Sequence, residues 1–495
     1  MPERLATMDA PRDQNVPHAK ETNPILLQNW LAVVALFAAF CFTVPLAPSA
    51  DTWWHLATGR FIAQTTTIPH VDPFSATAAG KPWIAHEWLA DVIFYATYSA
   101  TGSMGLLFLA CAFTTLAFWF AYRSLGGPPV SRALALVIAV WAARPDFSVR
   151  PQLFSFFMAG MFLYLLRRYI TGGSAKILFP LPILMLLWVN LHGGYVLGLA
   201  LIFLFAVGII LDAIWGREDR PAAAPRVKTL ALALLACLLV VPLNPNGLAL
   251  YTYPFQTLHS SAMQAGIMEW RSPDFHSPMF YPLAALLFLT IAVLALSPSR
   301  PMASEILLFV FFGLAALRSM RNLPFFALIA APLLGRYLVF PALRQPLIPE
   351  RLHRILKLSA IILAAALSAQ FVSSRFAQTL QMEKARFPLR ASAFLDQQNL
   401  PAPIFNSYDF GGYLIWKLYP RYHVYIDGRA DLYGDQFLNN FIRLYEVNED
   451  PKPALDRAAI RTIIVEPNST LAGYLRTQKE WNRAYEDPVA VIFTR

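Results

Sequence analysis

The sequence has few charged residues for its length. Asp, Glu, Lys and Arg make up only 14% of the 495 residues, against roughly 25% in soluble domains. Hydrophobic residues make up 57%, and the mean hydropathy is +0.46. Apolar runs of about 17–22 residues, long enough to cross a hydrocarbon core of roughly 30 Å, recur along the first three quarters of the chain. These features exclude an ordinary soluble domain and predict a polytopic α-helical membrane protein.

Cysteine and the common motifs of soluble enzymes are also scarce. Cys41, Cys111 and Cys237 lie inside apolar runs without metal-like spacing, so we interpret them as small buried hydrophobic residues. His86-Glu87 lacks the second histidine of a zinc protease, and Gly411-Gly412 lacks the GxGxxG spacing of a dinucleotide site. The sequence therefore predicts neither a zinc protease nor a dinucleotide-binding enzyme. We also expect no nucleic-acid partner.

The apolar runs predict about eleven membrane spans, with an error of about two in either direction. The run at 25–47 is long for a signal peptide, so we expect it to be a retained first span. Trp88–Tyr98 is interrupted by Asp91 and is either an interfacial helix or part of a span. The predicted spans are 25–47, 104–122, 132–143, 152–166, 177–190, 195–215, 229–243, 281–297, 305–317, 323–340 and 355–371.

The distribution of positive charge predicts the orientation. If the N-terminus is cytoplasmic, the inner segments carry about 18 Lys and Arg residues and the outer loops about 7, as the positive-inside rule requires. We therefore predict a cytoplasmic tail at 1–24 and a transmembrane domain at 25–371. Its long outer loops are 48–103 and 244–280, and an extracytoplasmic domain occupies 372–495. The expected location is a bacterial inner (plasma) membrane.

The first outer loop begins with an unusual cluster, Asp51-Thr-Trp-Trp-His55. Tryptophan is common at membrane boundaries, and Asp51 is either the N-cap of the next helix or part of a polar site. An interfacial role for the indoles does not explain His55 or the later pair His86-Glu87 in the same loop. We interpret the loop as one wall of a site that opens at the membrane surface.

Four arginines oppose the charge rule because they lie in tight outer loops. Guanidinium groups bind phosphate through a fixed fork of donors, so these residues are candidates for binding a lipid phosphate. The alternative is pairing with Asp146, with Glu269 or with lipid headgroups. In the second long outer loop, Glu269 is a candidate to complete the site, and His192 lies in a short outer turn. The four arginines are Arg144, Arg150, Arg318 and Arg321.

The last part of the chain has the composition of a soluble α/β domain. Helices are expected at 390–400 and 436–445, and buried strands at 404–406, 424–426 and 462–465. An edge strand is expected at 489–494. The connections that follow the strands carry polar residues, where α/β domains place binding loops. These candidates are Tyr408, Asp409, Asp427 and Arg429.

Several of these segments together resemble the GT-C superfamily of membrane glycosyltransferases, and within it the catalytic subunit of oligosaccharyltransferases. Asp51-Thr-Trp-Trp-His55 and Asp72-Pro-Phe74 resemble the first-loop pattern of that family. Ser407-Tyr-Asp-Phe-Gly411 resembles its Trp-Trp-Asp-Tyr-Gly acceptor motif, and Tyr425-Ile-Asp-Gly428 resembles the segment that follows it. In this chain Ser407 and Tyr408 replace the two tryptophans, and Asp146 stands alone where the family has paired acidic residues.

The resemblance implies transfer of a sugar from a polyprenyl-phosphate-linked donor to a glycan, lipid or protein acceptor of the cell envelope. Asp51, His55 and Glu269 would be catalytic, and the four outer arginines would bind the donor phosphate. His86, Glu87, Tyr408, Asp409, Asp427 and Arg429 would contact the acceptor. Asp51 and Asp146 would hold a divalent cation, Mg²⁺ or Mn²⁺, if one is used. Membrane lipids are the other expected partners.

Two other classes remain open at this point. A transporter or flippase of lipid-linked intermediates would show internal repeats and polar residues at mid-membrane depth. The spans contain almost no charge, and no repeat is evident. A non-catalytic scaffold for envelope assembly would bind a lipid-linked sugar without turning it over.

Overall fold

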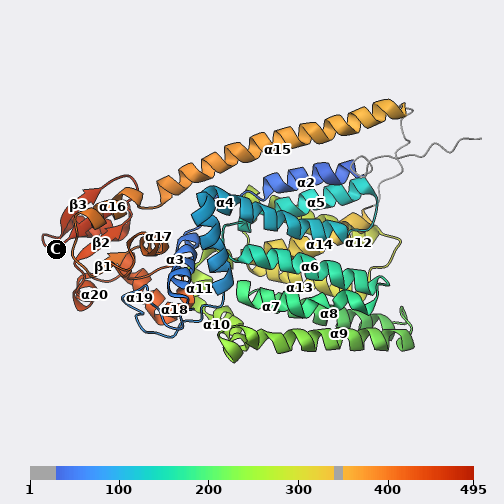
Figure 1. The fold of residues 1–495 in the computed structure, drawn as a ribbon, viewed down its shortest axis with the longest axis horizontal. Coiled ribbons are helices and arrows are strands. Elements are labelled where there is room, and N and C mark those ends of the chain that lie inside the picture. The colour runs from blue at the N-terminus through green and yellow to red at the C-terminus, as the bar shows by residue number, and fades with distance from the viewer. Residues whose placement is uncertain (1–28, 339–348) are drawn as a thin grey trace, which may run out of the picture.

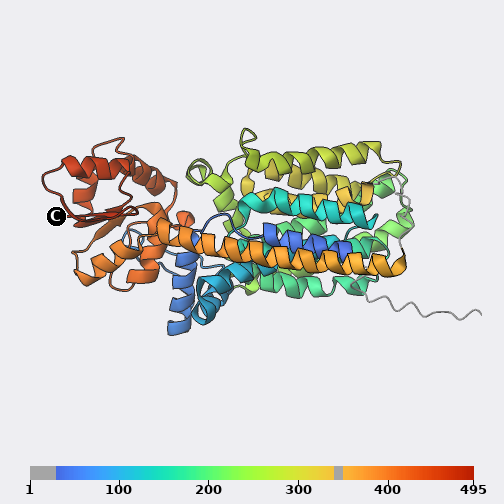
Figure 2. The same cartoon turned by 90° about the horizontal axis from the view of Figure 1, so that it is seen from above.

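The computed structural model describes residues 29–338 and 349–495. A bundle of long helices meets a smaller layer of helices and sheet at one end (Figure 1). Helix α15, Glu350–Arg386, runs along the outside of the bundle beside α2 and leads into the smaller layer (Figures 1 and 2). The predicted tail at 1–24 lies outside the described residues.

The bundle helices coincide with the predicted spans. Besides α15 they are α2 Trp30–Phe42, α4 Trp88–Arg123, α5 Pro129–Ala143, α6 Gln152–Ile170, α7 Pro180–Leu191, α8 Tyr195–Ile214, α9 Arg220–Val240, α12 Tyr281–Leu296, α13 Ala303–Arg318 and α14 Leu323–Tyr337. Residues 25–28 and 339–340, at the ends of two predicted spans, lie outside the described residues.

Helix α4 begins earlier than its predicted span. It starts at Trp88 and changes direction at Gly102, whose φ of 64° is open to glycine without steric cost. Trp88–Tyr98, for which the sequence left two interpretations, is thus the first part of α4. The polar residue Asp91 lies in its first turn and is buried against α3.

Within the described residues, six helical segments are long and apolar enough to cross a membrane. They are Trp88–Arg123, Gln152–Ile170, Tyr195–Ile214, Arg220–Leu243, Pro278–Leu296 and Glu350–Arg386. A straight span needs about 20 residues, and the remaining bundle helices are shorter. The multi-span architecture is therefore confirmed, whereas the count of eleven spans stays a prediction.

Helix α14 lies at the centre of the bundle, and nearly all of its residues are buried. The fully buried carboxylate of Glu305, in the first turn of α13, accepts hydrogen bonds from Arg167 at 3.0 Å and from the Tyr337 hydroxyl at 2.8 Å. Arg336 donates to the same carboxylate at 3.2 Å. A buried charge needs such partners, so this network connects α6, α13 and α14.

The smaller layer is built on a four-stranded sheet in the order β1-β2-β4-β3. Strands β1 and β2 are parallel, whereas β4 is antiparallel to both β2 and β3. The strands are β1 Ile404–Asn406, β2 Thr462–Val465, β3 Asn482–Glu486 and β4 Val491–Thr494. The helices are α16 Leu389–Gln397, α17 Tyr408–Leu418, α18 Ala430–Tyr433, α19 Asp435–Tyr445, α20 Lys452–Arg457 and α21 Thr470–Thr477.

Two predictions about this layer are wrong and one boundary shifts. Val424–Ile426 forms no strand, because its only ladder contact is an isolated bridge between Val424 and Ser75. Strand β4 lies inside the sheet, since the polar segment Asn482–Glu486 pairs along its free side and becomes the edge. Helix α15 continues to Arg386, so the predicted domain boundary at residue 372 falls within a helix.

The first outer loop is part of the smaller layer. Phe74, Trp83 and Ala85 share a hydrophobic core with residues of α16, α17 and the sheet. The Arg429 guanidinium, 1% exposed, bridges Asp72 of this loop and Asp427, each at 2.7 Å. Because these buried charges are paired across the two segments, they fasten the loop to the C-terminal part of the chain.

Replacement of Glu305 by alanine should destabilise the bundle strongly. The change leaves the buried Arg167 guanidinium without its carboxylate, a defect that typically costs about 3–5 kcal/mol. Thermal unfolding in detergent should show a lower Tm. The control is Glu350→Ala, because Glu350 pairs with Arg354 on an exposed surface, where a pair contributes about 0–1 kcal/mol. Equal Tm values for the two variants would contradict a structural role for the Glu305 network.

Candidate active site

A cavity of about 1230 Å³ lies between the bundle and the C-terminal layer. Its walls come from α3, the start of α4, the turn after α5, the turn after α7, the second outer loop and the C-terminal layer. Helix α3, Asp51–Thr65, presents two polar side chains to it, since Asp51 and His55 are four residues apart and share one helix face. The predicted site residues that line the cavity are Asp51, His55, His86, Glu87, Asp146, Arg150, Glu269, Arg321, Tyr408, Asp409 and Arg429.

Three of the predicted site residues do not line this cavity. Asp427 is fully buried behind it, hydrogen-bonded to Arg429 and to the Tyr433 hydroxyl at 2.6 Å. Arg318 is exposed at the end of α13. Arg144 lies on the outer side of the bundle, where its guanidinium packs over the Phe42 ring at 5.7 Å.

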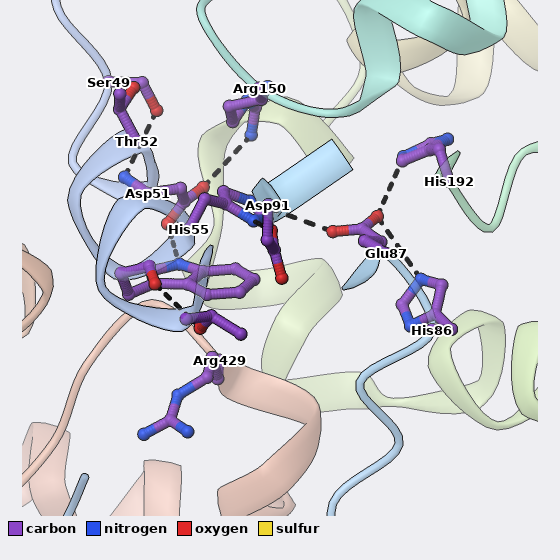
Figure 3. Close-up of polar contacts among 12 residues, drawn as sticks. Ser49, Asp51, Thr52, His55, His86, Glu87, Asp91, Arg150, His192 and Arg429 are labelled. Carbon is purple, nitrogen blue, oxygen red and sulfur yellow. Dashed lines mark hydrogen bonds and ion pairs between the residues drawn. The ribbon is translucent and has the colours of Figure 1, made fainter. Parts of the chain in front are cut away.

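Asp51 is held by contacts from three directions. It is the first residue of α3 and not its N-cap, which is Ala50. Trp54 Nε1 donates to Oδ1 at 3.3 Å, and Arg150 Nη1 donates to Oδ2 at 3.4 Å (Figure 3). On the third side lies Gly428, where a Cβ atom would overlap Oδ1. Any larger residue at this position would displace the Asp51 side chain, so glycine lets the C-terminal layer approach the carboxylate.

Arg150 gathers three carboxylates from separate parts of the chain. Besides Asp51 it contacts Glu269 of the second outer loop, and its Nη2 lies 3.8 Å from Asp146 Oδ1. Glu269 also lies 3.8 Å from Arg321 Nη1, and the Arg321 guanidinium packs over the Trp270 ring at 4.4 Å. The second outer loop is thus fastened to the bundle by charge pairs at the cavity wall.

These contacts set the ionisation of the acids. Burial raises the pKa of Asp51 to about 6, and Arg150 opposes part of that rise. Burial also raises the pKa of Asp146. Burial alone would raise the pKa of Glu269 as well, but Arg150 and Arg321 outweigh it and hold that pKa below its usual value. The pKa of Asp146 reaches about 8, so Asp51 and Asp146 both titrate near neutral pH, and Asp51 is the one of the two that is mostly ionised there.

A second polar group lies beside Asp51, where three imidazoles surround Glu87 (Figure 3). His86 Nε2 and His192 Nε2 lie 3.3 and 3.5 Å from Glu87 Oε1, and His55 Nε2 lies 3.8 Å from Oε2. His55 Nδ1 is 2.6 Å from an Asp91 carboxylate oxygen. The sequence singled out His55, His86 and Glu87. The sequence did not indicate a role for Asp91 in the site, because Asp91 lies within an apolar helical segment.

The imidazoles differ in charge. Burial lowers the pKa of His55 to about 3 and that of His192 to about 4, so both are neutral at physiological pH. Burial would also lower the pKa of His86, but the adjacent Glu87 outweighs it and the pKa is raised. Burial acts to raise the pKa of Glu87, but His86 and the other two imidazoles bring it well below its usual range. The group is one charged pair flanked by two neutral donor–acceptor rings, an arrangement suited to binding hydroxyl groups.

The carboxylates do not fit a divalent cation as arranged. The described part of the chain contains no group of three or more His, Cys, Asp or Glu residues that could hold a metal ion. The predicted pair, Asp51 and Asp146, both contact the Arg150 guanidinium, which supplies positive charge where a metal would need open oxygen ligands.

Sequence reasoning missed several residues of the cavity. Arg386, at the end of α15, donates to Asp409 at 2.9 Å and to the Pro48 carbonyl at 2.9 Å. Tyr253 packs against His86 with ring centroids 4.5 Å apart and donates to Asp431 at 2.9 Å. No local motif marks these residues, because their partners lie between 23 and 338 positions away along the chain.

The arrangement, a helical bundle with a polar cavity at one end and a C-terminal layer over that cavity, is similar to the folds of two solved structures. One similar solved structure is ArnT from Cupriavidus metallidurans bound to undecaprenyl phosphate, at 13% identity and a TM-score of 0.51. The match covers 94% of this chain and 97% of that one.

A second similar structure is the Archaeoglobus fulgidus oligosaccharyltransferase tethered to an acceptor peptide containing the NVT sequon. It has 12% identity and a TM-score of 0.52, with 88% of this chain and 68% of that one covered. No protein-family model and no curated protein sequence matches this chain. At these identities the likeness establishes the fold, and it confirms the GT-C resemblance seen in the sequence.

Replacement of Gly428 by alanine should disturb the Asp51 carboxylate. The added methyl group would overlap Oδ1 and would lie 3.0 Å from Trp54 Nε1, so we expect a loss of stability of about 1–3 kcal/mol from overpacking. Thermal unfolding and the near-ultraviolet circular dichroism of the tryptophans should both change. Gly473→Ala is the matched control, since a methyl group there has no neighbour within 4 Å. Identical behaviour of the two variants would show that Gly428 does not press on the site.

Proposed function

We propose that this chain is an inverting membrane glycosyltransferase that moves a sugar from a polyprenyl-phosphate-linked donor to an envelope acceptor. The acceptor is a glycan, a lipid or a protein, and the reaction takes place at the outer face of a bacterial inner membrane. The central observation is that Asp51, with its pKa of about 6, shares one cavity with the Arg150 and Arg321 guanidiniums. The undecaprenyl phosphate in the similar ArnT structure supports a donor of this class.

In the proposed step Asp51 acts as the general base. Its ionised carboxylate takes the proton of an acceptor hydroxyl, and the acceptor oxygen forms a bond to the anomeric carbon of the donor sugar. The bond between that carbon and the phosphate oxygen breaks, and its electron pair leaves with the polyprenyl phosphate. Attack from the opposite side of the leaving group inverts the configuration. Arg321 and Arg150 stabilise the negative charge that grows on the phosphate.

The remaining residues of the cavity fit a carbohydrate. Neutral His55 and the His86–Glu87 pair offer both donors and acceptors to hydroxyl groups. Tyr408 and Asp409 enter from the C-terminal layer, and the Tyr408 hydroxyl donates to the Gly428 carbonyl at 3.2 Å beside Asp51. We propose that these two residues contact the acceptor. Asp427 and Arg429 hold the wall in place, because their charges are already paired.

Replacement of Asp51 by asparagine should abolish transfer, with a loss of about 100-fold or more that is typical for a missing general base. The assay is transfer of labelled sugar from a polyprenyl-phosphate donor in detergent or proteoliposomes. Asp450→Asn, at an exposed position of the C-terminal layer, is the control and should keep full activity. A folded Asp51→Asn protein with full activity would refute the mechanism. If the unaltered protein binds the donor without turnover, a scaffold is favoured. If it moves the intact donor across the bilayer, a transporter is favoured.

The pH dependence of transfer should reflect Asp51. A carboxylate accepts a proton only when ionised, so the rate should increase about tenfold per pH unit up to about pH 6 and level off above it. Arg150 lowers the pKa of Asp51, so Arg150→Gln should move this midpoint upward, and Arg150→Lys should move it less. Arg421→Gln, which removes an exposed partner of Asp396, should leave the profile unchanged. An unshifted midpoint in Arg150→Gln would show that another group controls the profile.

A further inference from the structure

His192 lines the cavity but has no part in the proposed step. It follows the last residue of α7, and its Nε2 atom lies beside the Glu87 carboxylate. Two groups converge on the other ring nitrogen. The Gly194 N–H donates to His192 Nδ1 at 3.0 Å, and the Ser155 hydroxyl of α6 lies 2.7 Å from the same atom. Trp188 Nε1 in turn donates to the Ser155 hydroxyl oxygen at 2.6 Å.

These contacts determine which ring nitrogen carries the proton. A main-chain N–H can only donate, so His192 Nδ1 must be an acceptor without a proton. An indole N–H also only donates, so the Ser155 oxygen accepts from Trp188 and its own hydrogen is left for His192. The single proton of the neutral ring is therefore on Nε2. Protonation of Nδ1 would break both hydrogen bonds, which agrees with the pKa of about 4 that burial gives His192.

The packing around His192 Nδ1 leaves little room for another arrangement. The Ser155 and Trp188 side chains are fully buried, on α6 and α7. A Cβ atom at position 194 would overlap the Ser155 hydroxyl and would lie 2.9 Å from His192 Nδ1. Glycine at this position therefore lets the main-chain N–H reach the imidazole.

His86 approaches the same carboxylate with the opposite arrangement of its ring. Its Nδ1 lies 3.2 Å from the Ile84 carbonyl oxygen, which can only accept, so this nitrogen carries a proton. The Nε2 atoms of His86 and His192 lie 3.3 and 3.5 Å from Glu87 Oε1 (Figure 3). Two N–H groups thus face one oxygen of Glu87. The other oxygen, Oε2, lies 3.8 Å from His55 Nε2, which is beyond hydrogen-bond distance.

We propose that Ser155 and Gly194 are positioning residues, which fix His192 as a neutral Nε2–H donor facing Glu87. Two donors at Oε1 hold the Glu87 carboxylate in one orientation and leave Oε2 to accept the hydrogen of a sugar hydroxyl. A substrate without that hydroxyl would leave a buried charged oxygen unpaired, so His192 contributes to specificity through Glu87. The sugar hydroxyl rests on the proposed function, whereas the position of the His192 proton does not.

Nitrogen NMR of full-length protein labelled with ¹⁵N-histidine tests the position of the proton. The His192 signals are those missing from His192→Gln. In the unaltered protein at neutral pH, Nδ1 should be unprotonated and Nε2 protonated. Ser155→Ala removes a hydrogen bond to the neutral ring, so the pH at which His192 gains its second proton should increase by about one unit. The other groups that act on this ring are unchanged in that variant: Glu87, Arg321, His86 and Arg150.

The matched control is Ser131→Ala in α5, where the buried hydroxyl has no hydrogen-bond partner in the described chain. This variant should leave the His192 signals unchanged. A proton on His192 Nδ1 in the unaltered protein would overturn the proposal, and so would an unshifted titration in folded Ser155→Ala. The first result needs no substitution at Ser155, so it decides the proposal even if Ser155→Ala does not fold.

Transfer kinetics test the link to the substrate. Ser155→Ala should raise KM about tenfold and change kcat little, because a hydrogen bond made alike in the ground and transition states is weakened. His192→Leu should have at least the same effect. His192→Gln should recover most of the loss, since an amide keeps both a donor and an acceptor. Ser131→Ala should match the unaltered protein.

The two measurements separate this proposal from the proposed function. Equal KM values in Ser155→Ala and Ser131→Ala would show that Glu87 does not bind the substrate in the way proposed. If the unaltered protein transfers no sugar at all, the proposed function fails. The NMR spectrum, which needs no turnover, then still decides whether Ser155 and Gly194 fix the proton of His192.

Discussion

The cavity depends on one guanidinium. Arg150 contacts Asp51, Asp146 and Glu269, which come from the first outer loop, the turn after α5 and the second outer loop. Three acids so close together could not all remain ionised, and each protonation would alter the others. A single fixed cation offsets the repulsion among the three carboxylates, and burial leaves Asp51 with a pKa of about 6.

The C-terminal layer acts on the same cluster through its backbone. Gly428 touches Asp51, and Gly412 approaches so closely that a Cβ atom there would lie 2.8 Å from the Ala50 carbonyl oxygen. Gly428 is the glycine of the segment Tyr425-Ile-Asp-Gly428, and at Gly411, which ends the segment Ser407-Tyr-Asp-Phe-Gly411, a Cβ atom would overlap the Ile426 carbonyl oxygen. The paired charges of Asp72, Arg429 and Asp427 keep the layer at this distance. The geometry of the proposed base therefore follows from packing between parts of the chain more than 350 residues apart.

Much of this arrangement could be predicted from local pattern. The long apolar runs indicated the helices, the cluster Asp51-Thr-Trp-Trp-His55 indicated one wall of the site, and arginines in outer loops marked Arg150 and Arg321. Two strands were predicted to the residue, Ile404–Asn406 and Thr462–Val465, because short apolar runs between turns are distinctive.

Other features could not be read from local pattern. Val424–Ile426 is as apolar as a strand, but it pairs with no strand of the sheet. Its backbone contact is an isolated bridge to Ser75 in the first outer loop. Strand β3 is polar and largely exposed, and strand order is a property of the whole sheet. The charge rule marked Arg144 and Arg150 alike, yet Arg144 packs over Phe42 outside the cavity and Arg150 lines the cavity, a difference set by helix packing. The grouping of His192 and Asp91 around His55 and Glu87 likewise depends on three helices meeting.

The position of Asp51 along the chain has a consequence for how the protein matures. Asp51 leaves the ribosome early, whereas Asp409, the partner of Arg386 at the end of α15, and Gly428 are made only after the last bundle helix. During synthesis the acid is exposed to water and keeps an ordinary affinity for protons, since burial is what raises its pKa. The proposed base thus acquires its raised pKa only when the last quarter of the polypeptide docks. An incomplete chain contains Asp51 but not the buried environment that raises the pKa of its carboxyl group.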